Sequence, residues 1–183
     1  VVILATKESH VLGDLLIRYI AGELNANIKA VIANHDYLQD LVEKFNIPFT
    51  CISAEGLSRE DHEDKMIAKI QEFEPDVIVL AKYMRILTSK FVDVFPKKVL
   101  NIHHSFLPAF IGANPYKQAH ERGVKIIGAT AHYVTNDLDE GPIVFQDVVR
   151  VDHSYSWEDM RNAGRNVEKI VVSNAFEMLL HDR

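Results

Sequence analysis

Three polar side chains in the second half of the sequence have the types that acyl-group chemistry uses, namely Asn101, His103 and Asp139. Asn101 and His103 are two positions apart on a predicted strand over 97–103, so they project from one face of it, whereas His104 projects from the other. Asp139 lies in the later turn 135–142, which reads TNDLDEGP. If the strand before this turn lies beside 97–103, all three side chains reach the same crevice.

These residue types suit the stabilisation of an oxyanion. An amide and a protonated imidazole can both donate to a carbonyl oxygen that gains charge, and this is often a large catalytic contribution. The Asp139 carboxylate could hydrogen-bond the His103 ring, fix its tautomer, favour its charged form and accept a proton from a nucleophile. The alternative is that Asn101 and His103 only satisfy the backbone at a strand end and that Asp139 is a turn residue.

The elements that must position these residues follow from hydrophobic periodicity. Apolar runs alternate with helical patterns, which is typical of a wound α/β sheet. Strands are expected at 1–5, 28–33, 49–52, 76–81, 97–103, 125–134 and 143–151. Helices are expected at 37–45, 88–94 and 116–121, the last of them after a loop at 107–115 that contains Gly112. A further helix should follow the loop at 6–13, with an apolar stripe that reaches Leu24. Two more should begin at a capping box at 58–61 and at a Ser156/Asp159 cap. The connection 135–142 is too short for a parallel crossover, so the last two strands should be antiparallel.

Composition limits the classes of function. With 183 residues and 48% hydrophobic content, we expect one domain, 1–183, with a proper core. The net charge of −6 has the wrong sign for a nucleic-acid partner, and no leader or long apolar run indicates export or a membrane span, so a cytoplasmic protein is expected.

No metal site is expected. There is no HExxH motif, and His62 and Glu63 are predicted on the solvated face of a helix. His103 and His104 should diverge on their strand, and His132 is expected to support the strand that carries Asn101. Cys51 is predicted in a buried strand with no base nearby, which argues against a thiol nucleophile.

One stretch, NIHHSFLP at 101–108, together with His132-Tyr133-Val134 and the following Asp139, carries a family resemblance. With ATKESHVLGDLL at 5–16, it resembles the formyltetrahydrofolate-dependent formyltransferase superfamily over essentially the whole chain, and its deformylase branch most of all. The resemblance implies an α/β, Rossmann-like formyltransferase fold, with a mostly parallel twisted sheet flanked by helices and an antiparallel hairpin near the C-terminus. It also implies Asn101, His103 and Asp139 as the catalytic trio. The implied contacts to the folate are Met84, Arg85, Ile86, Leu87, Thr135, Asn136, Asp137, Leu138 and Glu140.

The activity that this resemblance implies is hydrolysis of 10-formyltetrahydrofolate to formate and tetrahydrofolate. The substrate would be folate and water, with no cofactor required, and the reaction would supply formate for purine synthesis and balance the one-carbon folate pool. The resemblance further implies an ACT-type regulatory domain upstream of this chain in the full-length protein. A homo-oligomer is expected.

Two alternatives remain open. One is a formyltransferase acting on an amine such as glycinamide ribonucleotide, whose relatives cradle the substrate phosphate with a Gly/Ser-Asn loop. Here that loop reads Lys7-Glu8-Ser9-His10, in which Glu8 would repel a phosphate. His104 stands where the transferases usually carry Pro or Ala. The other alternative is a folate-binding or regulatory module without activity, with which an intact trio fits poorly.

Overall fold

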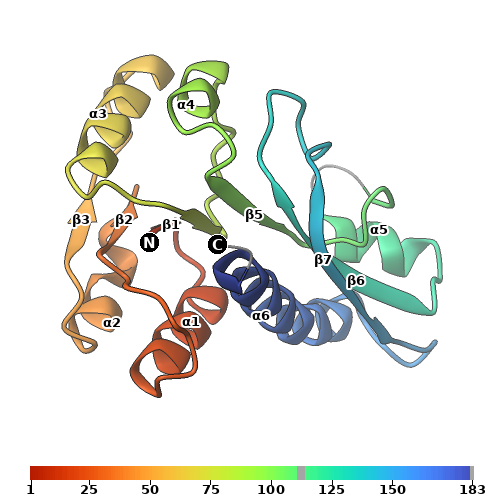
Figure 1. Cartoon of the computed structure of the whole chain (residues 1–183). Helices are drawn as coiled ribbons and strands as arrows, with labels where there is room; N and C mark the ends of the chain where they lie inside the picture. Colours follow the sequence, from red (N-terminus) through yellow and green to blue (C-terminus); the bar gives the residue numbers. More distant parts are fainter. Residues whose placement is uncertain (111–113, 182–183) are drawn as a thin grey trace.

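The computed structural model describes residues 1–110 and 114–181, and a seven-stranded twisted sheet forms its centre (Figure 1). The strands follow one another in the order β3-β2-β1-β4-β5-β6-β7. The first five are parallel, β6 is antiparallel to β5, and β7 is antiparallel to β6. The expected architecture of a mostly parallel sheet with a C-terminal antiparallel pair is therefore confirmed. The strand bounds are Val2–Ala5 (β1), Ala30–Ala33 (β2), Phe49–Cys51 (β3), Ile78–Ala81 (β4), Val99–His103 (β5), Ile126–Tyr133 (β6) and Ile143–Arg150 (β7).

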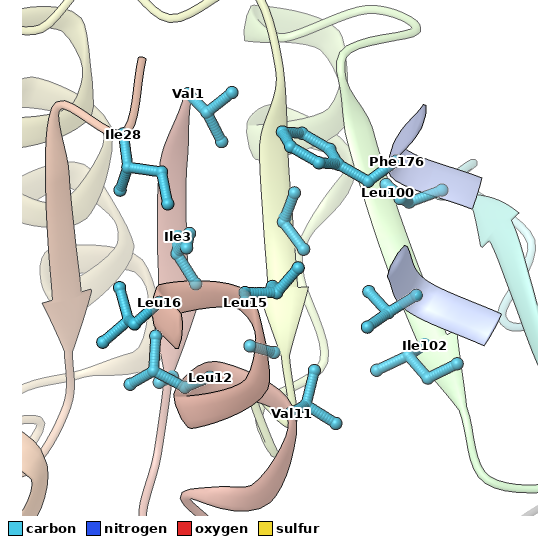
Figure 2. Packing of buried hydrophobic residues seen from close by; sticks show 14 of the residues in the cluster. Val1, Ile3, Val11, Leu12, Leu15, Leu16, Ile28, Leu100, Ile102 and Phe176 are labelled. Carbon is cyan, nitrogen blue, oxygen red and sulfur yellow. The ribbon is translucent and has the colours of Figure 1, made fainter. Parts of the chain in front are cut away.

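Helices cover both faces of the sheet (Figure 1). Their bounds are His10–Ile20 (α1), Asp36–Leu38 (the 3-10 helix η1), Gln39–Glu43 (α2), Arg59–Gln71 (α3), Ser89–Val94 (α4), Pro115–Glu121 (α5) and Trp157–His181 (α6). On one face, Leu12 and Leu15 of α1 and Phe176 of α6 pack against the strands, as Figure 2 shows. On the other, Met66 of α3 and Phe91 of α4 are buried against the opposite side chains. All residues of β1, β2 and β4 are buried, because helices cover both faces of these strands. This burial explains why their sequences are continuous apolar runs.

The helix starts expected from caps are also present. The Ser58 hydroxyl accepts the backbone N–H of Asp61 at 3.0 Å, and the Ser156 hydroxyl accepts that of Asp159 at 3.1 Å. α1 begins at His10, so the loop expected over 6–13 is shorter than predicted. The reason is that Val11 and Leu12 already belong to the buried stripe of α1. Leu24 lies beyond the end of this helix.

Two predictions about burial are wrong. His62 and Glu63 are buried, because His62 Nε2 hydrogen-bonds the Ile52 carbonyl at 2.9 Å and Glu63 accepts the backbone N–H of Thr88 at 2.9 Å. Cys51 is exposed, because β3 is an edge strand and Cys51 is its last residue. Partial desolvation of the thiol and the charge of Asp36 still raise the pKa of Cys51, which opposes a nucleophilic role. Gly112 of the expected loop lies outside the described residues.

Candidate active site

The trio lies in a cavity of about 870 Å³ at the carboxyl ends of the parallel strands. Ligand sites of open α/β sheets occupy this edge. Asn101 and His103 come from β5, and Asp139 comes from the turn between β6 and β7. The loops that follow β1 and β4 contact each other here, because the Met84 backbone N–H donates a hydrogen bond to the Thr6 hydroxyl at 3.0 Å.

The three predicted catalytic side chains meet, and a fourth residue joins them. Asp139 Oδ2 lies 3.3 Å from His103 Nδ1, and Asp139 Oδ1 lies 3.5 Å from His132 Nε2. Asn101 pairs with His132 across β5 and β6, and its Nδ2 donates to His132 Nε2 at 3.2 Å. His132 is held in turn, because its Nδ1–H donates to the Tyr133 carbonyl at 2.9 Å. His132 therefore orients two members of the trio, as well as supporting the strand as expected.

The turn that carries Asp139 depends on two backbone features. Asp139 itself has φ of 57°, in the left-handed region that residues with a side chain seldom adopt. Gly141 packs so closely on β6 that a Cβ there would overlap the Tyr133 carbonyl oxygen. The Tyr133 backbone N–H donates to the Pro142 carbonyl at 2.9 Å, which fixes the base of the turn. The carboxylate is thus held over the β5 end by a strained, closely packed turn.

Burial and neighbouring charges set the charge states of Asp139 and His103. The neighbouring His132 ring is the main cause that lowers the pKa of Asp139, and His103 adds to it, so the carboxylate is ionised at neutral pH. Burial lowers the pKa of His103, and this outweighs the raising effect of Asp139. Asp139 thus favours the charged form of His103, as expected, but burial of the ring is the larger effect. His103 Nε2 is buried and has no hydrogen-bond partner among the described residues.

The residues expected to contact the folate gather at one end of the cavity. Residues 84–87 and 135–138 line it, whereas Glu140 of the same turn is not among the lining residues. Met84, Ile86 and Leu138 expose more than half of their surface, at 59%, 59% and 56%. Large apolar side chains left open beside a few polar groups are typical of a site for a flat, largely apolar ligand.

The part of the cavity beside α1 and α5 contains a buried charged cluster that sequence reasoning missed. Glu168 of α6 is fully buried, and its carboxylate accepts Tyr116 O–H at 2.5 Å and His10 Nε2–H at 2.8 Å. Lys82 Nζ lies 3.3 Å from the same carboxylate. The only available signal was a Glu at position 168 inside the buried stripe of Val167, Val171 and Val172.

His104 also lines this cavity, contrary to the expectation that it faces away from His103. The strand ends at His103, so the alternation of side chains does not extend to the next residue. The ring centroids of His103 and His104 are 5.4 Å apart, and the other neighbour of His104 is the Tyr116 ring at 5.9 Å. Burial, with Lys82 nearby, lowers the pKa of His104 to about 4.

Within residues 1–110 and 114–181, no group of three His, Cys, Asp or Glu side chains is placed to hold a metal ion. In the same part of the chain, no helix has the length and apolar character needed to cross a membrane.

Comparison with known proteins places the sequence and the fold among relatives. The family model described as formyl transferase matches residues 1–176. A formyltetrahydrofolate deformylase of Escherichia coli K12 is 61% identical over all 183 residues. The crystal structure of a formyltetrahydrofolate deformylase from Pseudomonas syringae is 46% identical over the whole chain, with a TM-score of 0.96. A phosphoribosylglycinamide formyltransferase from Brucella melitensis is 30% identical over 97% of this chain and 93% of its own, with a TM-score of 0.91.

The two kinds of relative differ in how much of them this chain spans. It covers 65% of the Escherichia coli deformylase and 61% of the Pseudomonas syringae structure, less than two thirds of each.

Proposed function

This chain belongs to the formyl transferase family, and we propose that it hydrolyses 10-formyltetrahydrofolate to formate and tetrahydrofolate. The observation that carries the proposal is the 61% identity to a deformylase over every residue of the chain, against 30% to a formyltransferase of nearly the same fold. The meeting of Asn101, His103 and Asp139 in one cavity supports it, since these side chains can activate water and stabilise an oxyanion.

In the proposed reaction, the pterin ring of the folate lies against 84–87 and 135–138, with the formyl group at the trio. A water molecule held by ionised Asp139 attacks the formyl carbon and gives Asp139 its proton. The carbonyl oxygen becomes an oxyanion and accepts the Asn101 N–H that does not bind His132, because an amide nitrogen has two hydrogens. Asn101 can do this at any pH.

The tetrahedral intermediate then collapses. The carbon–nitrogen bond breaks, and the proton taken from water passes from Asp139 through His103, 3.3 Å away, to the departing folate nitrogen. The products are tetrahydrofolate and formic acid, which ionises to formate. All of these steps use side chains of the chain itself, and the proposal includes no metal or cofactor.

The proposal also covers the partners, the location and the oligomeric state of the enzyme. The net charge of −6 opposes a nucleic-acid partner, and we place the protein in the cytoplasm. We expect a homo-oligomer, because Ile17 and Ile20 of α1 and Ile170 of α6 leave large apolar surfaces open, at 61%, 60% and 45% exposure.

The test is formate release from 10-formyltetrahydrofolate by purified protein, with and without glycinamide ribonucleotide. Steady release without the nucleotide is expected, and Asp139→Asn should lower kcat by about 10²- to 10⁴-fold, the usual contribution of a general base. Asp93→Asn, an exposed carboxylate of α4 outside the cavity, is the matched control and should keep full activity. Formyl transfer to the nucleotide with no release in its absence would make the protein a transferase instead.

A further inference from the structure

Helix α6 presents a stripe of side chains to the part of the cavity beside α1 and α5, where Glu168 binds His10 and Tyr116. The proposed pterin segment 84–87 lies on the other side, because the Ile86 carbonyl accepts a hydrogen bond from Arg59 of α3, which covers the opposite face of the sheet. Trp157, Arg161, Arg165 and Glu168 all line the cavity. Their spacings of four, four and three residues put them on one face of a helix. The stripe therefore forms one continuous wall, separate from the segments 84–87 and 135–138.

This end of the cavity is cationic. Its charged lining residues are Lys82, Lys117, Arg161, Arg165, Glu8 and Glu168. Glu168 is already occupied by Tyr116, His10 and Lys82, and Glu8 lies 2.9 Å from Arg165 Nη2. The two carboxylates are thus compensated, and two positive charges remain in excess.

The two arginines of the stripe keep unused donors. Among the described residues, the buried Nε atoms of Arg161 and Arg165 have no hydrogen-bond partner. Arg161 has no ion-pair partner in that part of the chain either, and its guanidinium carbon lies 5.1 Å from the centre of the Trp157 ring. Buried donors are normally satisfied, so the unpaired Nε–H groups of two arginines that line one cavity indicate a missing acceptor. A planar anion such as a carboxylate matches the guanidinium fork.

We propose that the Arg161–Arg165 face of α6 is a subsite for the carboxylate of formate, through which the product leaves while the folate still occupies the other end. This inference rests on the proposed function, which generates formate at the trio between the two ends. The folate closes the way past 84–87 and 135–138, so the anion moves toward the excess positive charge. We assign the subsite to formate because formate is the anion that the proposed reaction generates at the trio.

Trp157 supplies a test that needs no turnover, since it is the only tryptophan in the sequence and lies in the stripe. Sodium formate is titrated against the protein while its fluorescence is recorded, with sodium chloride at the same ionic strength as the reference. A saturable, formate-specific change is expected, and it should persist with saturating tetrahydrofolate. Arg165→Gln should raise the half-saturating formate concentration at least about tenfold, as expected for one lost charge-assisted hydrogen bond.

Arg165 is the better position to change, because replacing Arg161 would alter the reporter ring directly. Arg165→Lys should recover part of the affinity, and Arg150→Gln, an exposed arginine at the end of β7, should bind formate like the wild type. The proposal is overturned if formate acts only as chloride does, if tetrahydrofolate abolishes the signal, or if Arg165→Gln titrates like the wild type. Tighter binding of inorganic phosphate than of formate would also overturn it.

The two proposals fail separately. If the protein releases formate but the formate titration does not saturate, the subsite proposal is wrong and the proposed hydrolase activity stands. A saturable titration in a protein that releases no formate removes the hydrolase and, with it, the assignment of this face as a product route.

Discussion

Asn101 and His103, the two oxyanion donors expected from the sequence, respond differently to their surroundings. Burial lowers the pKa of His103, so its ring is neutral at pH 7 and carries a single N–H. The Asn101 amide does not titrate, and His132 fixes its orientation at 3.2 Å. At the residue scale, therefore, Asn101 is the donor that is ready before the substrate arrives.

Replacing Asn101 tests this reading. Asn101→Ala should lower kcat by about 10²- to 10³-fold, the usual cost of removing one oxyanion donor, while KM for the folate changes little. The reason is that the donor meets an oxyanion only in the transition state. The measurement is steady-state formate release over a range of folate concentrations.

Asn162→Ala, which changes an exposed asparagine of α6 outside the cavity, serves as the matched control. A rise in KM with native kcat would show that Asn101 holds the ground-state substrate, against the role assigned to it.

At this scale the positions of the three site residues could be predicted from the sequence, but the burial of their side chains could not. The shared face of Asn101 and His103 follows from strand alternation, and Asp139 follows from the turn after the neighbouring strand. The charge of His103 depends on how much water the completed cavity excludes, which no local pattern contains. Likewise Glu63 lies in a polar stretch of the sequence, and the donor that satisfies its buried carboxylate, the Thr88 backbone N–H, lies 25 positions later.

At the element scale, the β6–β7 hairpin delivers Asp139. Its antiparallel pairing was predictable from the length of the connection, but the left-handed conformation of Asp139 was not, because a polar turn sequence is compatible with several turn types. The close approach of Gly141 to β6 is likewise a tertiary contact. The turn therefore offers a way to move the carboxylate without changing its chemistry.

Gly141→Ala should displace the turn, because the new Cβ would overlap the Tyr133 carbonyl oxygen. We expect kcat to fall by at least about 10²-fold, since a misplacement of about 1 Å costs that much in an oriented site, together with a lower Tm. Formate release and thermal unfolding are measured on the same preparation.

Gly13→Ala is the matched substitution, because Gly13 lies within α1 with nothing within 4 Å of its added Cβ. In a helix this change should raise stability by about 0.5–1 kcal/mol and leave kcat unchanged. Native activity in Gly141→Ala would mean that the base of the turn does not set the position of Asp139.

For the whole molecule, the cavity joins α1, the β4 end, α5 and α6 through buried ionisable groups, which couples stability to pH. Burial opposes the charge of Glu168, but the hydrogen bond from His10, the charge of Lys82 and the Tyr116 hydroxyl together lower its pKa to about 2. Its stabilising effect is therefore complete above its unfolded pKa of 4.5 and is lost only as the pH falls toward 2. Between pH 7 and pH 5 it adds almost no slope.

In that same window His104 does add a slope. Its pKa is 6.5 when unfolded and about 4 in the folded protein, so as the pH falls below 6.5 the unfolded chain binds a proton that the folded chain does not. The free energy of unfolding should then fall by about 2 kcal/mol between pH 7 and pH 5 on account of His104 alone. His103, whose pKa is also lowered, acts in the same direction. Urea unfolding at the two pH values measures the difference.

His104→Gln removes the titrating group and keeps a polar side chain of similar length, so the difference between pH 7 and pH 5 should shrink by about that 2 kcal/mol. His153→Gln, at an exposed histidine before α6, should leave the difference unchanged. An equal loss in the wild type and His104→Gln would mean that the His104 ring keeps its proton on folding. The buried wall of Lys82, Tyr116 and Glu168 would then be more hydrated than its packing indicates, because only water or a nearer carboxylate could hold that charge.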